Sequence, residues 1–310
     1  MSGVLIVKVK KDDDGIRLNR WFLKEYPSLS LAHLQKLLRT KQIKVDGKRA
    51  ETSTRLLAGQ EIRLPPLDAQ KAPLKDNFVS KTDEKLMQSF VVYKDENIIV
   101  INKPSGMAVQ GGTNQTRHID GLLDALKFEK EERPKLTHRI DKETSGLLVL
   151  ARNRKSALAL TKAFREHTIK KTYLALCAGR PKKDSGEIKA NLEKIGEKTE
   201  IVESGQKAVT NYQVLDSAAD KFSLIQAEPL TGRTHQIRAH LAYIGAPILG
   251  DTKYGRKEDV KRANISPKLH LHAWKIDLSA IAAKKLVVKA PIPDYLNNDI
   301  HFLGLNFKEK

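Results

Sequence analysis

The stretch HRIDKETSGLLVLAR, residues 138–152, sets one carboxylate, Asp141, between Arg139 and Lys142 and then runs through Thr-Ser-Gly into a short apolar segment. Such a segment bounded by turn residues is typical of a buried strand. Comparable runs recur to the end of the chain, among them FVVY, NIIVIN, KTYLALCA, FSLIQAEPL, KLHLHAWKIDL and LVVKAP, with the helical stretches SALALTKAFREH and THQIRAHLAYIG between them. This pattern predicts an α+β domain over residues 89–310, built on a mixed, mainly antiparallel sheet.

A smaller unit is predicted over residues 15–64. Leucines at helical spacing follow the potential helix cap Ser30, and Asp46-Gly47 is a hairpin-type turn between two short strands. The unit has 11 Lys and Arg against 4 Asp and Glu, a net charge of 11 − 4 = +7. Residues 65–88 contain three prolines, many charges and little periodicity, which indicates a linker between the two domains.

The charge of the whole chain indicates a polyanionic partner. Its formal net charge is +19, from 56 Lys and Arg against 37 Asp and Glu, and nucleic acid is the first expectation. A membrane surface is disfavoured, because no apolar run approaches ~18 residues and no basic helix has a clean apolar stripe. No secretory leader is recognisable, and the single cysteine, Cys177, lies in a strand pattern, so we expect a cytoplasmic protein without disulfides.

Motifs for nucleotide cofactors and metals are missing from the sequence. There is no G-x-G-x-x-G, no G-x-x-x-x-G-K-[ST] and no G-x-S-x-G. Ser145 is interpreted as a structural turn serine rather than a nucleophile. His270 and His272 would share one face of a strand but lack Cys or carboxylate partners at metal spacing, so packing or hydrogen bonding is the preferred interpretation. We therefore expect no metal and no cofactor.

Four segments carry a resemblance to a known family. They are HRIDKETSG, EPLTGRTHQIRAHLAYIGAPILGDTKYG (228–255), KPSGMAVQGG (103–112) and KKTYLALCAG (170–179). Together they resemble the Rlu family of pseudouridine synthases over residues 89–310, and the paired glycines Gly111 and Gly112 are similar to those of members that act on the large ribosomal subunit. The unit at 15–64 resembles the S4 RNA-binding fold, which many of these enzymes have. The expected fold is thus a pseudouridine synthase domain with a small S4-like domain.

The resemblance implies roles for individual residues of the larger domain. Asp141 corresponds to the family's catalytic aspartate and Arg238 to its cationic partner, which would hold the carboxylate ionised, by a hydrogen bond that could be bidentate. Tyr173 corresponds to a tyrosine that stacks on the uracil and helps to move the C5 proton. Arg139 corresponds to a residue that fills the RNA stack after the target nucleotide has been flipped out. Leu271 is the expected apolar wall of the uracil pocket.

Purely structural roles for the same residues remain open at this point. Asp141 and Arg238 could form a structural salt bridge, Tyr173 could be a half-buried strand residue, Arg139 a surface ion-pair partner and Leu271 part of the core. In the small unit, basic side chains are candidates for RNA phosphate contacts, against the alternative of a solvated basic face. These candidates are Arg20, Lys36, Arg39, Lys41, Lys44 and Lys48.

The sequence therefore predicts an RNA pseudouridine synthase that isomerises specific uridines of 23S ribosomal RNA. It would use a single catalytic aspartate and base flipping, without metal or cofactor, and nothing requires more than a monomer. The alternative is a non-catalytic RNA-binding or ribosome assembly factor with a synthase-like domain.

Overall fold

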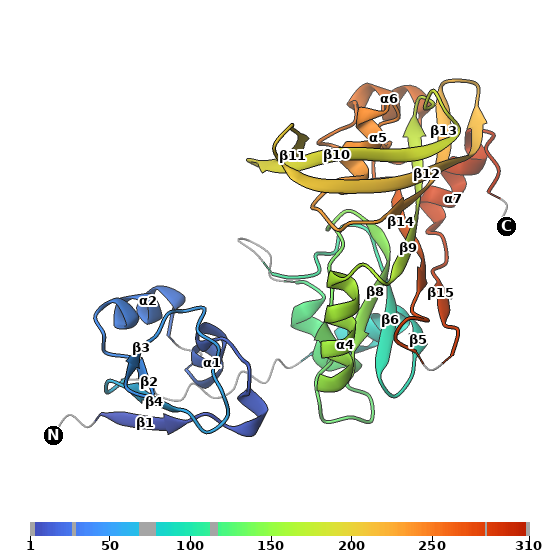
Figure 1. The fold of residues 1–310 in the computed structure, drawn as a ribbon. Coiled ribbons are helices and arrows are strands. Elements are labelled where there is room, and N and C mark those ends of the chain that lie inside the picture. Colours follow the sequence, from blue (N-terminus) through green and yellow to red (C-terminus); the bar gives the residue numbers. More distant parts are fainter. Residues whose placement is uncertain (1–3, 27–28, 68–78, 112–116, 283, 308–310) are drawn as a thin grey trace. The chain divides into compact units, whose positions relative to one another are not determined.

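The chain forms two compact units, Met1–Phe78 and Val79–Lys310, which are described separately (Figure 1). A computed structural model describes residues 4–26, 29–67, 79–111, 117–282 and 284–307. Gly112, one of the paired glycines, lies outside the described residues, as does the segment 68–78 of the expected linker.

The first unit packs two helices on a small antiparallel sheet. Its core holds Trp21 and Phe22 of one helix and Leu34, Leu37 and Leu38 of the next. Strand order is β1-β4-β2-β3. The elements are β1 (Leu5–Lys8), the 3₁₀ helix η1 (Lys11–Asp13), α1 (Leu18–Glu25), α2 (Leu31–Arg39), β2 (Lys44–Val45), β3 (Lys48–Arg49) and β4 (Glu61–Leu64).

Two local features of this unit confirm the sequence interpretation. The hydroxyl of Ser30 accepts a hydrogen bond of 3.2 Å from the His33 amide and so caps α2. Asp46 and Gly47 have φ values of 48° and 73°, as a tight two-residue hairpin between β2 and β3 requires. Leu31 differs from the other leucines of α2, because it lies at the first helical turn and is 40% exposed.

The predicted linker extended too far. Helix α3 (Lys81–Ser89) occupies its last residues and belongs to the second unit. The Ser80 hydroxyl accepts a 3.0 Å hydrogen bond from the Asp83 amide and caps the helix, while Met87 is fully buried beside Ile99 and Leu148. The helix buries a single side chain and is otherwise mostly polar or charged, so its sequence lacks the periodic apolar face by which helices are recognised.

The second unit is built on an eleven-stranded sheet, and its α+β class is confirmed. Nine strands follow the order β11-β10-β12-β13-β9-β14-β8-β6-β5, with β15 on β14 and β7 on β8; among the described pairs only β14 with β8 is parallel. The strands are β5 (Val91–Lys94), β6 (Ile98–Lys103), β7 (Lys135–Leu136), β8 (Ser145–Ala151), β9 (Lys170–Ala178), β10 (Ser185–Ile195), β11 (Lys198–Ile201), β12 (Gln206–Ala218), β13 (Phe222–Pro229), β14 (Leu271–Asp277) and β15 (Val287–Lys289). The helices are α3, η2 (Asp120–Leu126), α4 (Arg154–Arg165), α5 (Gln236–Tyr243), α6 (Lys257–Ala263) and α7 (Asp294–Phe302).

Each expected apolar run forms a strand, but four further strands were not expected, the two-residue β7 and the longer β10, β11 and β12. β10, β11 and β12 lie together at one end of the sheet, and most residues of β10 are exposed. A strand with one solvent-exposed face and many charged residues has no continuous apolar run. Its sequence is therefore difficult to distinguish from that of a loop.

Gly146 allows the central strands to approach each other at the start of β8. Its φ is +109°, and a Cβ atom placed there would lie 2.3 Å from the carbonyl oxygen of Ala273 on β14. The neighbouring Ser145 is buried, and its hydroxyl lies 2.9 Å from Nδ1 of His272. Ser145 is therefore structural as predicted, although it begins a strand rather than forming a turn.

Replacing Gly146 should destabilise the second unit strongly. We expect Gly146→Ala to lower its free energy of unfolding by about 3 kcal/mol or more, because positive φ and overpacking each cost about 1–3 kcal/mol. Urea unfolding followed by Trp274 fluorescence, in a Trp21→Phe background, measures this. Gly196→Ala is the control, since Gly196 has φ +59° but no heavy atom near its missing Cβ. Equal losses for the two variants would contradict the steric account.

Candidate active site

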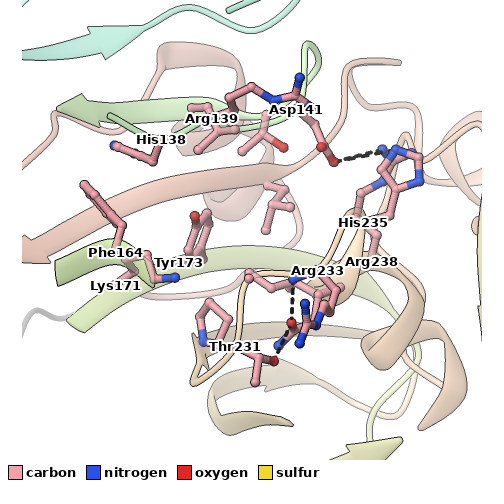
Figure 2. Close-up of a pocket in the computed structure, with 17 residues that line it drawn as sticks. His138, Arg139, Asp141, Phe164, Lys171, Tyr173, Thr231, Arg233, His235 and Arg238 are labelled. Atoms are coloured by element: carbon pink, nitrogen blue, oxygen red, sulfur yellow. Dashed lines mark hydrogen bonds and ion pairs between the residues drawn. The ribbon is translucent and has the colours of Figure 1, made fainter. Parts of the chain in front are cut away.

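Five of the residues singled out in the larger domain line one cavity. Asp141 and Arg139 come from the loop between β7 and β8, Tyr173 from β9 and Arg238 from α5 (Figure 2). Leu271 comes from the start of β14. The cavity volume is about 120 Å³. A larger hollow of about 1000 Å³ shares Arg139, Asp141 and Arg238 with it. Among the described residues that line the smaller cavity, Asp141 is the only carboxylate.

Tyr173 has small neighbours on both adjacent strands. It pairs with Ala227 of β13 and with Ala273 of β14, and both alanines are buried. Directly opposed residues in adjacent strands share a face of the sheet, so the tyrosine ring projects beside two methyl groups instead of two large side chains. Burial, and then the charge of Asp141, raises the pKa of Tyr173 above its ordinary value. The phenol is therefore protonated at neutral pH.

Arg238 is fixed by a carboxylate to which the sequence analysis gave no role. Its Nε and Nη2 atoms each donate a hydrogen bond of 2.7 Å to Asp251, and its Nη1 donates one of 3.2 Å to Oδ2 of Asp141. The expected bidentate contact is thus made with Asp251, and Asp141 receives a single bond. Because Asp251 holds the edge of the planar guanidinium that carries Nε and Nη2, the direction of Nη1 is also fixed.

Burial makes the charges of this cluster mutually dependent. The side chain of Asp251 is fully buried, and its Oδ1 also accepts hydrogen bonds from the amides of Lys253 and Tyr254. Burial alone would lower the pKa of Arg238, but hydrogen bonds and charge from Asp251, followed by those from Asp141, raise it. The guanidinium therefore stays charged where it donates to Asp141.

The motif GRTHQIR positions Arg238 through its glutamine. Nε2 of Gln236 donates 2.9 Å hydrogen bonds to Val209 O and Thr210 Oγ1, and its Oε1 accepts from Thr231 Oγ1 and the Arg233 amide. This buried side chain therefore ties the start of α5 to β12 and to the preceding loop.

His235 precedes α5 in a left-handed conformation, with φ 52°. Its Nδ1 lies 3.0 Å from the Tyr254 hydroxyl, and its Nε2 lies 3.9 Å from Oδ2 of Asp141. Burial lowers the pKa of His235, opposed by Asp141 and reinforced by Arg238. The imidazole is therefore a weak second neighbour of the carboxylate, after Arg238.

Lys103, from KPSG, supports the loop that carries Asp141. The lysine is fully buried, and its Nζ donates 2.9 Å hydrogen bonds to the carbonyl oxygens of Pro104, Met107 and Lys142. Burial lowers the pKa of Lys103 to about 7, against opposing effects of Glu143 and Asp141. The bond to Lys142 fixes the backbone next to Asp141.

Arg139 and Leu271 occupy opposite environments at this site. Arg139 is exposed, and its Nη1 donates a 3.3 Å hydrogen bond to Gln110; within the described residues it makes no ion pair, so the surface ion-pair alternative gains no support. Leu271 is 3% exposed and packs in the core cluster that includes Tyr173, while also lining the cavity.

The six basic candidates, Arg20, Lys36, Arg39, Lys41, Lys44 and Lys48, all belong to the first unit. Five are exposed, Lys44 is partly buried, and none forms an ion pair with a described residue. Their charges are therefore available to an anionic ligand.

The described residues contain no group of three or more His, Cys, Asp or Glu side chains that could hold a metal ion. His270 and His272 are buried; His270 bonds to Asp299 and the Leu249 carbonyl, and His272 to Ser145, which confirms their structural interpretation. Cys177 is buried in the core, as predicted. Within the described ranges, no helix is both long and apolar enough to cross a membrane.

Sequence reasoning quoted the segments that contain Asp251, Tyr254, His235 and Gln236 but assigned these residues no function. All four lie within residues 228–255, and the dense polar content of that segment was the available indication. Gln236 bonds to β12, Tyr254 bonds to Thr199 of β11, and Asp251 reaches Arg238 across thirteen residues of chain, so these contacts depend on the fold.

Comparisons with known proteins agree with this geometry. The model of the RNA pseudouridylate synthase family matches residues 97–243. Ribosomal large subunit pseudouridine synthase C of Rickettsia bellii is 39% identical, covering 91% of this chain and 96% of the relative, and RNA pseudouridine synthase 4, mitochondrial, of Arabidopsis thaliana is 35% identical over 89% and 73%.

A solved structure, human RNA pseudouridylate synthase domain containing 4, is similar with a TM-score of 0.62 and 29% identity, over 73% of this chain and 97% of that one. These matches confirm the family that the four sequence segments indicated. The fold, the cavity and these matches together show that the chain belongs to the RNA pseudouridylate synthase family and is an isomerase.

Proposed function

We propose that this enzyme converts specific uridines of large-subunit ribosomal RNA to pseudouridine, with Asp141 as its single catalytic carboxylate. Relatives from several bacteria are named ribosomal large subunit pseudouridine synthase C, which supports the substrate class. The observation that carries the catalytic assignment is the meeting of Asp141, Tyr173 and Arg238 in one small cavity.

The sizes of the two hollows support base flipping. A volume of about 120 Å³ is below the roughly 300–1,000 Å³ of pockets for drug-sized ligands. It suits a single base, and the adjoining 1000 Å³ hollow suits the strand from which that base departs. A stacked uridine cannot bring its C1′ to Asp141, so it must leave the stack. Arg139, exposed at the rim, fills the vacated position.

The reaction needs only one carboxylate because the base never leaves. A glycosidase normally uses two, since one group protonates the leaving group and the other attacks or activates water. Here the N1–C1′ bond breaks with its electron pair going to uracil, the base turns over, and C5 bonds to C1′. The C5 proton is finally replaced by one on N1, so composition is unchanged. Asp141 acts on the ribose in its ionised form, stabilised by Arg238.

Tyr173 supports the base rather than acting as a phenolate. Its raised pKa keeps the hydroxyl protonated, and an aromatic ring on the cavity wall is a stacking surface for uracil. Leu271 closes the apolar side. No step requires a metal or a cofactor.

The basic first unit would bind RNA in an S4-like manner. Its +7 charge and its six candidate side chains, which form no ion pair with a described residue, suit sequence-independent phosphate contacts. Since the described cavity is complete within one chain, we propose a monomer, working in the cytoplasm on ribosomal RNA.

The direct test is carbodiimide mapping of an unmodified 23S RNA transcript with and without the protein. We expect new pseudouridine stops at defined positions. The alternative, an inactive assembly factor, predicts RNA binding without any new stop, and that result would overturn the enzymatic proposal for this substrate.

Removing the charge of Asp141 should abolish catalysis without removing binding. Asp141→Asn should give no detectable tritium release from [5-³H]uridine RNA, because the ribose no longer meets an ionised carboxylate. Its RNA affinity in a filter-binding assay should stay within a few fold of wild type. Turnover at the wild-type rate would remove the catalytic assignment.

Asp251 should matter through Arg238. Asp251→Asn breaks the buried bidentate pair, which should cost about 3–5 kcal/mol of stability, and should slow single-turnover catalysis at least about tenfold because Arg238 is no longer aimed at Asp141. The control is Asp184→Asn, which removes an ion pair with Arg180 at a carboxylate whose side chain is 66% exposed. Unchanged catalysis in Asp251→Asn would show that the pair does not position the carboxylate.

The first unit should account for part of the salt dependence of binding. Lys36→Gln with Arg39→Gln should lower the slope of log K against log salt by about 1.4–1.8, if both side chains contact phosphate. Lys182→Gln with Lys183→Gln, an equal loss of exposed charge in the second unit, serves as the control. A slope unchanged by the first pair would remove these two phosphate contacts.

A further inference from the structure

Lys171 is a cavity-lining cation that the proposed mechanism does not use. It lies on β9 two residues before Tyr173, so both side chains are on the same face of the sheet. It lines the smaller cavity beside Phe164 and His138, as Figure 2 shows. Its Nζ makes no hydrogen bond or ion pair with any residue that the structure describes.

An unpartnered lysine in such a place is uncommon. Lys side chains are rarely withdrawn from water without a partner, because the desolvated ammonium loses hydrogen bonds. Burial lowers the pKa of Lys171, and burial is its only resolved cause. The three donors of this side chain therefore face a cavity with nothing described to accept from them.

The neighbouring His138 does not supply a counter-charge for Lys171. His138 stacks on Phe164 with ring centroids 4.1 Å apart, and its Nε2 accepts a 2.9 Å hydrogen bond from the Val149 amide. Burial, and then the charge of Lys171, lowers the pKa of His138 to about 3. His138 is thus neutral and offers Lys171 no counter-charge.

Lys171 and Asp141 flank Tyr173 from different sides. In Figure 2 the carboxylate of Asp141 lies on one side of the Tyr173 ring, and Lys171 with Phe164 lies on the other. A uridine with its C1′ at Asp141 and its base on Tyr173 would point the far edge of the base at Lys171.

We propose that Lys171 donates a hydrogen bond to the uracil carbonyl opposite the glycosidic bond and stabilises the detached base. This inference rests on the proposed function, since it takes Asp141 as the group that meets the ribose. In this proposal the substrate accepts the hydrogen bond that no described residue accepts from the Lys171 ammonium group.

The geometry of uracil makes one donor suitable for both substrate and product. In uridine, C4 lies opposite N1 across the ring, so O4 is the carbonyl farthest from C1′. When the base turns over about its N3–C6 axis, N1 exchanges with C5 and O4 with O2. The carbonyl opposite C1′ in pseudouridine is then O2, and it occupies the place that O4 left.

Lys171 also stabilises the detached base that forms between uridine and pseudouridine. When N1–C1′ breaks, the electron pair that stays with uracil is delocalised onto O2 and O4. A donor placed where this charge develops stabilises it more than it stabilises the neutral base. The 4-amino group of cytosine is a donor and would face the Lys171 donors unfavourably, so Lys171 also favours uracil over cytosine.

The test compares Lys171→Met, Lys171→Arg and the control Lys170→Met in single-turnover tritium release from [5-³H]uridine 23S RNA transcript. Lys170 is the exposed neighbour on β9, so its variant loses the same charge outside the cavity. We expect Lys171→Met to be slowed at least about tenfold, as for loss of a hydrogen bond to a charged group. Lys170→Met should stay within about twofold, and Lys171→Arg should recover part of the rate.

Substrate substitution separates a contact with the base from a structural role. An RNA fragment containing a mapped target is synthesised with uridine or 4-thiouridine there, because sulfur accepts hydrogen bonds weakly. The thio substitution should slow the wild type at least about fivefold and Lys171→Met less than about twofold, which is the coupling expected for two groups in contact. Equal slowing of both proteins would overturn the proposed contact.

The outcomes distinguish this inference from the function on which it rests. If the wild-type protein releases no tritium, the proposed function fails. If the wild type is active and Lys171→Met matches Lys170→Met, the proposed function stands and the role of Lys171 is wrong.

Discussion

The pair between Arg238 and Asp251 is the interaction on which the rest of the site depends. Two 2.7 Å hydrogen bonds to a fully buried carboxylate leave the guanidinium one orientation, and in that orientation Nη1 reaches Asp141. Asp141 itself is partly exposed, with 29% of its side chain open to solvent. The buried aspartate therefore holds the arginine, and the arginine aims the exposed aspartate at the cavity.

Backbone constraints bring the elements of the site to that pair. Gly146 lets β8 approach β14 closely, and Lys103 binds the carbonyl of Lys142 next to Asp141. On the other side, Gln236 ties the start of α5 to β12. Three segments far apart in sequence are thus fixed by glycine sterics and by buried hydrogen bonds.

The sequence was informative where chemistry is local. The apolar runs predicted the central strands, Ser30 and Asp46-Gly47 predicted a cap and a turn, and the motifs indicated the family and the residues that meet in the cavity. Helix α3 and strands β10–β12 were not predicted, because exposed polar residues interrupt the periodic apolar pattern by which such elements are recognised. Asp251, the partner of Arg238, was not predicted for another reason. The sequence contains many carboxylates and does not show which of them lies next to Arg238 in the folded chain.

Lys171 is a second residue whose importance the sequence does not indicate. In sequence it is one basic residue among 56, and only the structure distinguishes it as a cation that lines a cavity without a described partner. Its significance depends on what lies around it, which neither composition nor spacing encodes.

The most direct measurement of the central claim is a crystal structure of the Asp141→Asn protein bound to an RNA that contains a mapped target uridine. The account predicts that uridine outside its stack, its base on Tyr173, its C1′ beside residue 141 and the Arg238–Asp251 pair intact. A uridine still stacked in the RNA with the cavity empty, or a base bound with its ribose away from residue 141, would contradict it.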